Sequence, residues 1–296
     1  MSERTSMRYK IVHTTTYTYS DAVPICHNEV HLIPRDAARQ ACLYNRLRIK
    51  PRPSVLEQRV DYFGNRVTNF AIEQAHQKLT VVALSRVHVT AAPPPIDPGL
   101  SAAWEDIRDA LASYSDLVEV YQFVFDSALA KSSAALREYA LPSFPPRRPI
   151  VAAALDLCQR IHHDFIYDPK ATTVSTPLPV VLELRRGVCQ DFAHLAIGCL
   201  RSLGLAARYV SGYLLTRPPA GKPRLVGSDA SHAWLSVYTG NSGWLDFDPT
   251  NNLVPSLEHI TLAWGRDYSD VCPIQGVFIG GGQHGLNVSV DVSPIS

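Results

Sequence analysis

Apolar and polar residues alternate through most of the first ninety residues, with the period of a β-strand that buries one face. The clearest run places Tyr9, Ile11, His13, Thr15 and Tyr17 on the same face. The strand candidates are residues 9–17, 30–32, 47–49, 66–72 and 79–89, with a turn signal at 61–65. This pattern predicts a β-rich N-terminal domain, which we expect to be sandwich-like.

A proline-rich segment separates this region from the rest of the chain. Four prolines fall within the six residues 93–98, where neither a strand nor the interior of a helix can continue. We therefore predict two domains: a β-rich N-terminal domain over residues 1–95, and a second domain over residues 96–296 that begins with a helical segment.

Helical periodicity begins after the prolines. The pattern is loose over residues 102–111 and 117–139, and it is clear over residues 150–165, where apolar side chains recur every three or four positions. Another apolar helix follows Gly187 and is predicted to end at Gly204, a residue suited to a helix C-cap.

Strand patterns follow this last helix, at residues 207–215, 232–238 and 244–248. The turn-forming residues 240–243 join the last two as a hairpin. Helices thus precede strands, and this order predicts an α+β domain with an antiparallel sheet.

Composition excludes some classes of function. Twenty-eight Lys and Arg against 27 Asp and Glu leave a formal charge of +1 with no basic run, so nothing favours a nucleic-acid partner. Residues 1–7 lack the apolar stretch of a signal peptide, and no window approaches the roughly 18 apolar residues of a membrane span. We expect a cytoplasmic protein, no membrane partner, and six cysteines that are free thiols.

The strongest candidate for chemistry is a cysteine at the start of the helix after Gly187. Cys189 is followed by His232 and then by Asp248. Thiol, imidazole and carboxylate are the parts of a nucleophile, base and orienting set. A free thiol is only a few per cent ionised at neutral pH, so the helix N-terminus and a protonated His232 would have to stabilise the thiolate.

The predicted hairpin brings the imidazole and a carboxylate side by side. With a period of two, His232 and Trp234 share one face of their strand, and Asp246 and Asp248 share the corresponding face of the next. Periodicity does not choose between Asp246 and Asp248 as the group that orients His232.

Metal and nucleotide sites are not predicted. There is no Cys-x-x-Cys pair and no His-Glu-x-x-His helix, and Cys26-His27 and His162-His163 are spaced too tightly for one metal. Residues 280–285 fit Gly-x-Gly-x-x-Gly, but the residues that follow alternate as a strand instead of opening a helix.

Other chemically active side chains have simpler interpretations. Cysteine is among the most buried residue types, so Cys158, Cys199 and Cys272 are interpreted as core residues. The polar cluster at residues 266–270 could line a cleft, but an exposed turn is the interpretation we adopt.

Several motifs together resemble the bacterial transglutaminase-like superfamily. The core motifs are GVCQDFAH (187–194), SHAW (231–234) and FDPTN (247–251). The segments at 13–19, 32–35 and 61–65 are similar to the β-rich N-terminal region of one bacterial branch, and 265–277 resembles its C-terminal segment. Only about residues 99–140 carry no recognisable motif, so the resemblance covers nearly the whole chain.

The resemblance implies a papain-like thiol fold, in which a helix carrying the cysteine packs on an antiparallel sheet. It maps the nucleophile to Cys189, the base to His232, and the orienting residue to Asp248, which stands immediately before Pro-Thr. It also implies that the chemistry uses no metal and no organic cofactor, and that the Cys189 backbone N–H is one oxyanion donor.

We therefore predict a thiol-dependent hydrolase or amidase, of the cysteine peptidase type. It would cleave peptide or isopeptide amide bonds of a peptide or protein substrate through an acyl thioester on Cys189. One alternative is a protein-glutamine transamidase, a transglutaminase, in which an amine resolves the thioester. The other is a binding module that retains the fold without catalysis and docks a partner through its β domain.

Overall fold

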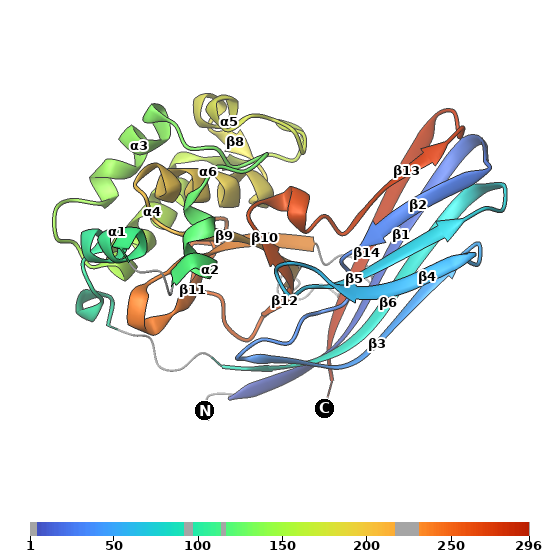
Figure 1. Cartoon of the computed structure of the whole chain (residues 1–296), viewed down its shortest axis with the longest axis horizontal. Coiled ribbons are helices and arrows are strands. Elements are labelled where there is room, and N and C mark those ends of the chain that lie inside the picture. The colour runs from blue at the N-terminus through green and yellow to red at the C-terminus, as the bar shows by residue number, and fades with distance from the viewer. Residues whose placement is uncertain (1–4, 92–96, 114–116, 217–230, 296) are drawn as a thin grey trace, which may run out of the picture.

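The computed structural model describes residues 5–91, 97–113, 117–216 and 231–295. Figure 1 shows a β sandwich at one end, a group of helices at the other, and a further sheet between them. The α+β class predicted from the sequence is confirmed. Among the described residues, no helix is long and apolar enough to cross a membrane.

The N-terminal strands form the sandwich. Its strands are β1 (Ser6–Val23), β2 (Ile25–Val30), β3 (Gln40–Lys50), β4 (Val55–Val60), β5 (Arg66–Ile72), β6 (His76–Thr90), β13 (Ile274–Ile279) and β14 (His284–Ile295). They make two four-stranded antiparallel sheets, with the orders β14-β1-β6-β3 and β13-β2-β5-β4. The alternation predicted along β1 is confirmed, because Tyr9, Ile11 and His13 are buried and Lys10 is exposed.

The sandwich is completed by the C-terminal end of the chain. β14 pairs with β1 and β13 pairs with β2, so the first and last strands lie side by side (Figure 1). The prediction that residues 96–296 form one unit is therefore wrong at its end, because residues 274–295 belong to the sandwich. Pairing them there covers strand edges that would otherwise be open. The predicted boundary between residues 95 and 96 lies outside the described residues.

The helices gather in the other half of the molecule. They are α1 (Trp104–Ser113), α2 (Val118–Tyr121), α3 (Ala134–Ala140), α4 (Ile150–Asp164), α5 (Leu178–Leu184) and α6 (Cys189–Ser202), with 3-10 turns at Pro98–Leu100, Gln122–Val124, Leu141–Ser143, Gly240–Ser242 and Tyr268–Asp270. The helix expected over residues 150–165 is confirmed. Residues 117–139 do not form one helix, because the Asp126 carboxylate accepts the backbone N–H and the hydroxyl of Ser132 and builds a turn instead.

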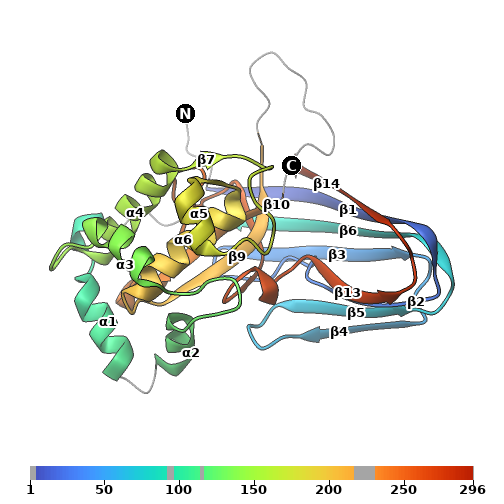
Figure 2. The same ribbon diagram turned by 90° about the horizontal axis from the view of Figure 1, so that it is seen from above.

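A third antiparallel sheet lies between the sandwich and the helices (Figure 2). Its strands are β9 (Ala207–Leu214), β10 (Ser231–Tyr238), β11 (Trp244–Phe247) and β12 (His259–Gly265), in the order β11-β10-β9-β12; a short parallel pair, β7 (Ile166–Tyr167) and β8 (Arg186–Gly187), lies outside it. Tyr209 of β9 stacks on His194 of α6 with ring centroids 4.8 Å apart, so that face packs on the helix. Alternate residues such as Arg208 and Trp234 face the other way.

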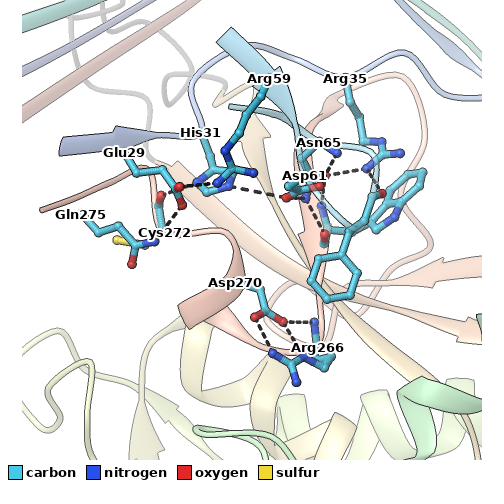
Figure 3. Close-up of polar contacts among 12 residues, drawn as sticks. Glu29, His31, Arg35, Arg59, Asp61, Asn65, Arg266, Asp270, Cys272 and Gln275 are labelled. Carbon is cyan, nitrogen blue, oxygen red and sulfur yellow. Dashed lines mark hydrogen bonds and ion pairs between the residues drawn. The ribbon is translucent and has the colours of Figure 1, made fainter. Parts of the chain in front are cut away.

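Two motifs of the N-terminal domain fix it to the central sheet (Figure 3). Asn65 accepts the Trp264 backbone N–H at 3.0 Å and donates to the Trp264 carbonyl at 2.8 Å. The Arg35 guanidinium lies over the Trp264 ring, 3.2 Å from its centroid, and donates to the Phe63 carbonyl. Arg35 and Asn65, the residues on the sandwich side of this contact, come from the segments 32–35 and 61–65. Those segments therefore have a structural role, the docking of the sandwich on β12.

Candidate active site

Cys189 is the first residue of α6 and is half-buried. The turn before it depends on Gly187, where a Cβ atom would lie 2.6 Å from a carboxylate oxygen of Asp191. That carboxylate accepts the Val188 backbone N–H at 2.8 Å and the Thr172 hydroxyl at 2.7 Å. Asp191 thereby caps the helix, and the close approach of Gly187 holds the thiol at the helix start.

The helix start gives the thiol a positive environment. As the first helical residue, Cys189 has a backbone N–H without an intrahelical acceptor, and its sulfur lies at the positive end of the dipole. The side chain of the next residue, Gln190, is engaged elsewhere: its amide donates a hydrogen bond to the Val174 carbonyl at 3.0 Å. The location of Cys189 in the first turn of a helix is the one predicted from the sequence.

The other five cysteines differ in their surroundings. All six are free thiols, as predicted, and Cys26, Cys158 and Cys199 are buried. Burial raises the pKa of the Cys199 thiol to about 12. Cys272 is only half-buried, so the prediction of a core residue is wrong there. Its thiol lies 3.3 Å from the Tyr268 hydroxyl, at the point where the chain returns to the sandwich.

His232 and Asp248 form a buried pair. The Nε2 atom of His232 lies 2.7 Å from Oδ2 of Asp248, and the carboxylate is fully enclosed. The other oxygen, Oδ1, accepts the backbone N–H groups of Thr250 at 3.0 Å and Asn251 at 3.1 Å. The turn after β11 thus holds the carboxylate, and the carboxylate holds the imidazole.

The pKa of His232 depends on both Asp248 and the Cys189 thiol. Burial alone would lower the pKa of His232, but its hydrogen bonds to Asp248 and Cys189, with their charges, outweigh burial and raise the pKa to about 9. Burial would raise the pKa of Asp248, but the hydrogen bonds from His232 and His259 hold it well below its ordinary value. Since Nε2 faces Asp248, the contact with Cys189 falls to Nδ1. At neutral pH His232 is therefore an imidazolium between a carboxylate and a sulfur.

The register of the hairpin separates the two aspartates that periodicity left open. β10 and β11 pair with Ser236 opposite Asp246, so both aspartates lie on the His232 face, as predicted. Asp246 accepts the Trp234 indole N–H at 3.1 Å. Asp248 lies two residues further on, and it is the carboxylate that contacts His232.

Two further residues contact the Asp248 carboxylate and were not assigned from the sequence. The Asn251 side-chain amide donates to Oδ2 at 2.7 Å, and Nε2 of His259 lies 3.0 Å from the same oxygen. His259 comes from β12, a strand that was not predicted. The alternation of Ile260, Leu262 and Trp264 in the sequence is the signal that would have found it.

Three of these residues have the donor atoms of a metal site. The donor atoms of His232, Asp248 and His259 all lie within 4.8 Å of one another. The Nε2 atoms of His232 and His259 lie 2.7 and 3.0 Å from the same oxygen of Asp248, so these groups are at hydrogen-bond distance from one another. The cluster therefore fits a hydrogen-bonded acid and base network better than a metal centre.

The polar segment at 266–270 braces α6 and lies apart from these residues. Asp267 is fully buried and accepts the Leu129 backbone N–H at 2.7 Å, so the interpretation as an exposed turn is wrong for this residue. The next backbone N–H, of Tyr268, donates to Nε2 of His194 at 3.1 Å. Burial lowers the pKa of His194 to about 4, so its ring is neutral and accepts this bond.

Comparison with known proteins agrees with this arrangement. Residues 9–88 match the model of the bacterial transglutaminase-like N-terminal region, and residues 144–249 match that of the transglutaminase-like superfamily. The uncharacterized protein Rv2569c of Mycobacterium tuberculosis is 43% identical over 295 residues, which cover 97% of this chain and 93% of the relative. A protein-glutamine gamma-glutamyltransferase of Pseudomonas aeruginosa is 36% identical over 110 residues, 36% of this chain and 16% of that protein.

A solved structure shares the whole architecture. It is described as "a Putative Cysteine Protease from Cytophaga hutchinsonii" and superposes with a TM-score of 0.78 at 20% identity, covering 99% of this chain and 92% of that one. The β sandwich and the helix-on-sheet core thus occur together in another protein. The chain belongs to the transglutaminase-like superfamily and carries the bacterial transglutaminase-like N-terminal region in front of the core.

Proposed function

We propose that the protein is a thiol-dependent amide hydrolase in which Cys189 is the nucleophile, His232 the acid and base, and Asp248 the orienting residue. The observation that carries the proposal is the placement of buried His232, with Nε2 2.7 Å from Asp248 and with Cys189, at the start of α6, as its other side-chain hydrogen-bond partner. A thiolate and imidazolium pair is the resting state that acyl transfer to sulfur requires.

The first half of the reaction forms an acyl-enzyme. The Cys189 thiolate attacks the amide carbonyl, and the negative charge moves to the carbonyl oxygen, where the Cys189 backbone N–H, at the N-terminus of α6, donates a hydrogen bond. His232 gives its proton to the leaving nitrogen as the C–N bond breaks. An amine departs and a thioester remains on the sulfur.

The second half returns the enzyme to its starting state. Neutral His232 takes a proton from water, the resulting hydroxide attacks the thioester carbonyl, and the acid leaves as the thiolate re-forms beside the imidazolium. Asp248 keeps the imidazole in one tautomer and stabilises its charge throughout. The five hydrogen-bond contacts of its carboxylate, two from backbone N–H groups, hold Asp248 in place during both proton transfers.

Hydrolysis is preferred over transamidation because water is the abundant acceptor wherever a site is not built to exclude it. The short match to a protein-glutamine gamma-glutamyltransferase favours the second candidate, transfer of a glutamine acyl group to an amine. We place the protein in the cytoplasm, an assignment that its six free thiols support.

One assay separates these functions. A glutamine-bearing peptide library is incubated with the enzyme and a labelled primary amine, and mass spectrometry follows hydrolysed and amine-linked products together. We expect hydrolysed products to dominate, and both products to disappear in Cys189→Ala. Amine-linked product in excess would establish the transamidase. Wild-type product formation no higher than in Cys189→Ala would favour the binding module.

A further inference from the structure

A cavity of about 560 Å³ lies between the sandwich and the central sheet, on the sheet face opposite α6. Three of the four tryptophans of the chain, Trp234, Trp244 and Trp264, line it. Among its described lining residues neither Cys189 nor His232 appears, so this space is separate from the thiol. Its walls come from both halves of the molecule, with residues of the loop before β3 on one side and β9 to β12 on the other.

The central feature of the cavity is a guanidinium between two indoles. Arg208 lies 4.3 Å from the ring centroid of Trp244 and 3.8 Å from that of Trp264. Its Nε atom is buried and has no hydrogen-bond partner among the described residues. Burial lowers the pKa of Arg208 to about 9, against the attraction of Asp246. A planar cation is thus held in a flat apolar slot with one N–H left unsatisfied, which costs free energy unless an acceptor arrives.

A second arginine of the cavity also has a guanidinium nitrogen without a hydrogen-bond acceptor among the described residues. Arg39 donates through Nη2 to the Pro255 carbonyl at 3.3 Å, while its Nη1 is buried and unpartnered among the described residues. Asp246 supplies the one carboxylate of the described lining, and it already accepts the Trp234 indole N–H. The described lining thus holds two guanidinium groups and one carboxylate, and that carboxylate already accepts a hydrogen bond. The cavity therefore has an excess of positive charge and of hydrogen-bond donors.

We propose that this cavity binds a small organic anion with a flat apolar body, such as an aromatic carboxylate or sulfonate. The acid group would accept the unpaired N–H groups of Arg208 and Arg39. The ring would lie along the apolar lining at the edges of the indoles, because Arg208 and Arg35 already cover the faces of Trp264. A cavity of this volume is within the range that encloses small ligands, and apolar walls with a few polar groups are their usual lining. The inference does not depend on the proposed hydrolase activity.

The bound anion would lie directly behind the His232 and Asp248 pair. His259 lines the cavity and its Nε2 lies 3.0 Å from the Asp248 carboxylate. Trp234, also in the lining, has its ring centroid 6.0 Å from that of His232. The same two side chains therefore face the ligand on one side and the candidate catalytic pair on the other.

The probe for this site is 8-anilinonaphthalene-1-sulfonate, titrated into the full-length protein with excitation of tryptophan and detection of the probe. The neutral control is N-phenyl-1-naphthylamine, which has the same rings without the sulfonate. We expect saturable binding of one sulfonate per chain, with energy transfer from the lining tryptophans, and binding of the neutral probe at least about tenfold weaker. Equal affinity for the two probes would overturn the proposal.

Three single arginine variants locate the binding. Arg208→Gln and Arg39→Gln are each expected to weaken sulfonate affinity about tenfold or more, whereas Arg59→Gln, on the exposed strand β4, removes the same charge away from the cavity and should leave affinity unchanged. Because Arg39 lies at the half-exposed rim, its variant remains informative if Arg208→Gln does not fold. Undiminished affinity in Arg39→Gln, or an equal loss in Arg59→Gln, would show that the probe binds elsewhere.

Discussion

Replacing Cys189 by alanine should lower turnover of an amide substrate by about 10⁴-fold or more, because the acyl-enzyme route requires the sulfur. The fold should survive the change, since Cys189 is half-buried and the cap of α6 is made by Asp191 rather than by the thiol. The measurement is kcat/KM on a peptide substrate identified from the library, with thermal unfolding recorded in parallel.

Cys42 provides the matched control. It is also a half-buried free thiol, but it lies on β3 in the sandwich. Cys42→Ala should keep wild-type kcat/KM within about twofold. A Cys189→Ala protein that retains more than a few per cent of wild-type turnover would exclude the thioester route.

Replacing Arg201 by leucine should produce the largest loss of stability. Arg201 lies near the end of α6 and is buried. Each nitrogen of its guanidinium donates hydrogen bonds to other groups of the protein. Its acceptors are the carbonyls of Phe123, Ala130, Ala207 and Arg266 and the Ser127 hydroxyl, at 2.7 to 3.0 Å. Leucine removes all five donors from a dry site, and the Ala130 carbonyl alone is known to keep another donor, the Ser127 backbone N–H at 3.2 Å. We expect the free energy of unfolding to fall by about 4 kcal/mol or more and Tm to fall by roughly 10 °C.

Arg137 is the control for this prediction. It lies on α3 and donates to the Ser202 carbonyl at the end of α6, but through one bond at an exposed site. Arg137→Leu should change the free energy of unfolding by less than about 1 kcal/mol. If denaturant unfolding gave the two variants similar stabilities, the buried hydrogen bonds of Arg201 would not anchor α6 as described.

The local elements of the fold were predictable because they depend on short-range patterns. Alternation located most strands of the sandwich, and the apolar period over residues 150–165 located α4. Long-range pairing was not predictable in the same way. Strands β13 and β14 have ordinary strand patterns, and nothing local in them indicates that they return to β2 and β1 across most of the chain.

The candidate site shows the same division. The hairpin placed His232 and two aspartates on one face, but the choice of Asp248 depends on a turn whose backbone N–H groups bind the carboxylate. His259 reaches that carboxylate from a strand at the opposite edge of the sheet, a contact that only the tertiary fold creates. Arg201 gave no sequence signal, because its five acceptors come from three separate stretches of the chain, residues 123–130, 207 and 266.

The central claim, a thiolate and imidazolium pair at Cys189 and His232, is tested most directly by iodoacetamide alkylation from pH 5 to 10.5, mapped by mass spectrometry. Because the pKa of His232 is raised from 6.5 to about 9, the imidazolium persists up to about pH 9 and is lost above it. At pH 6 we expect Cys189 to react roughly 100-fold faster than a cysteine in an unstructured peptide, with a second change in rate near pH 9. His232→Ala should abolish the excess rate at pH 6. A single rise near pH 8.5, unaffected by His232→Ala, would contradict the claim.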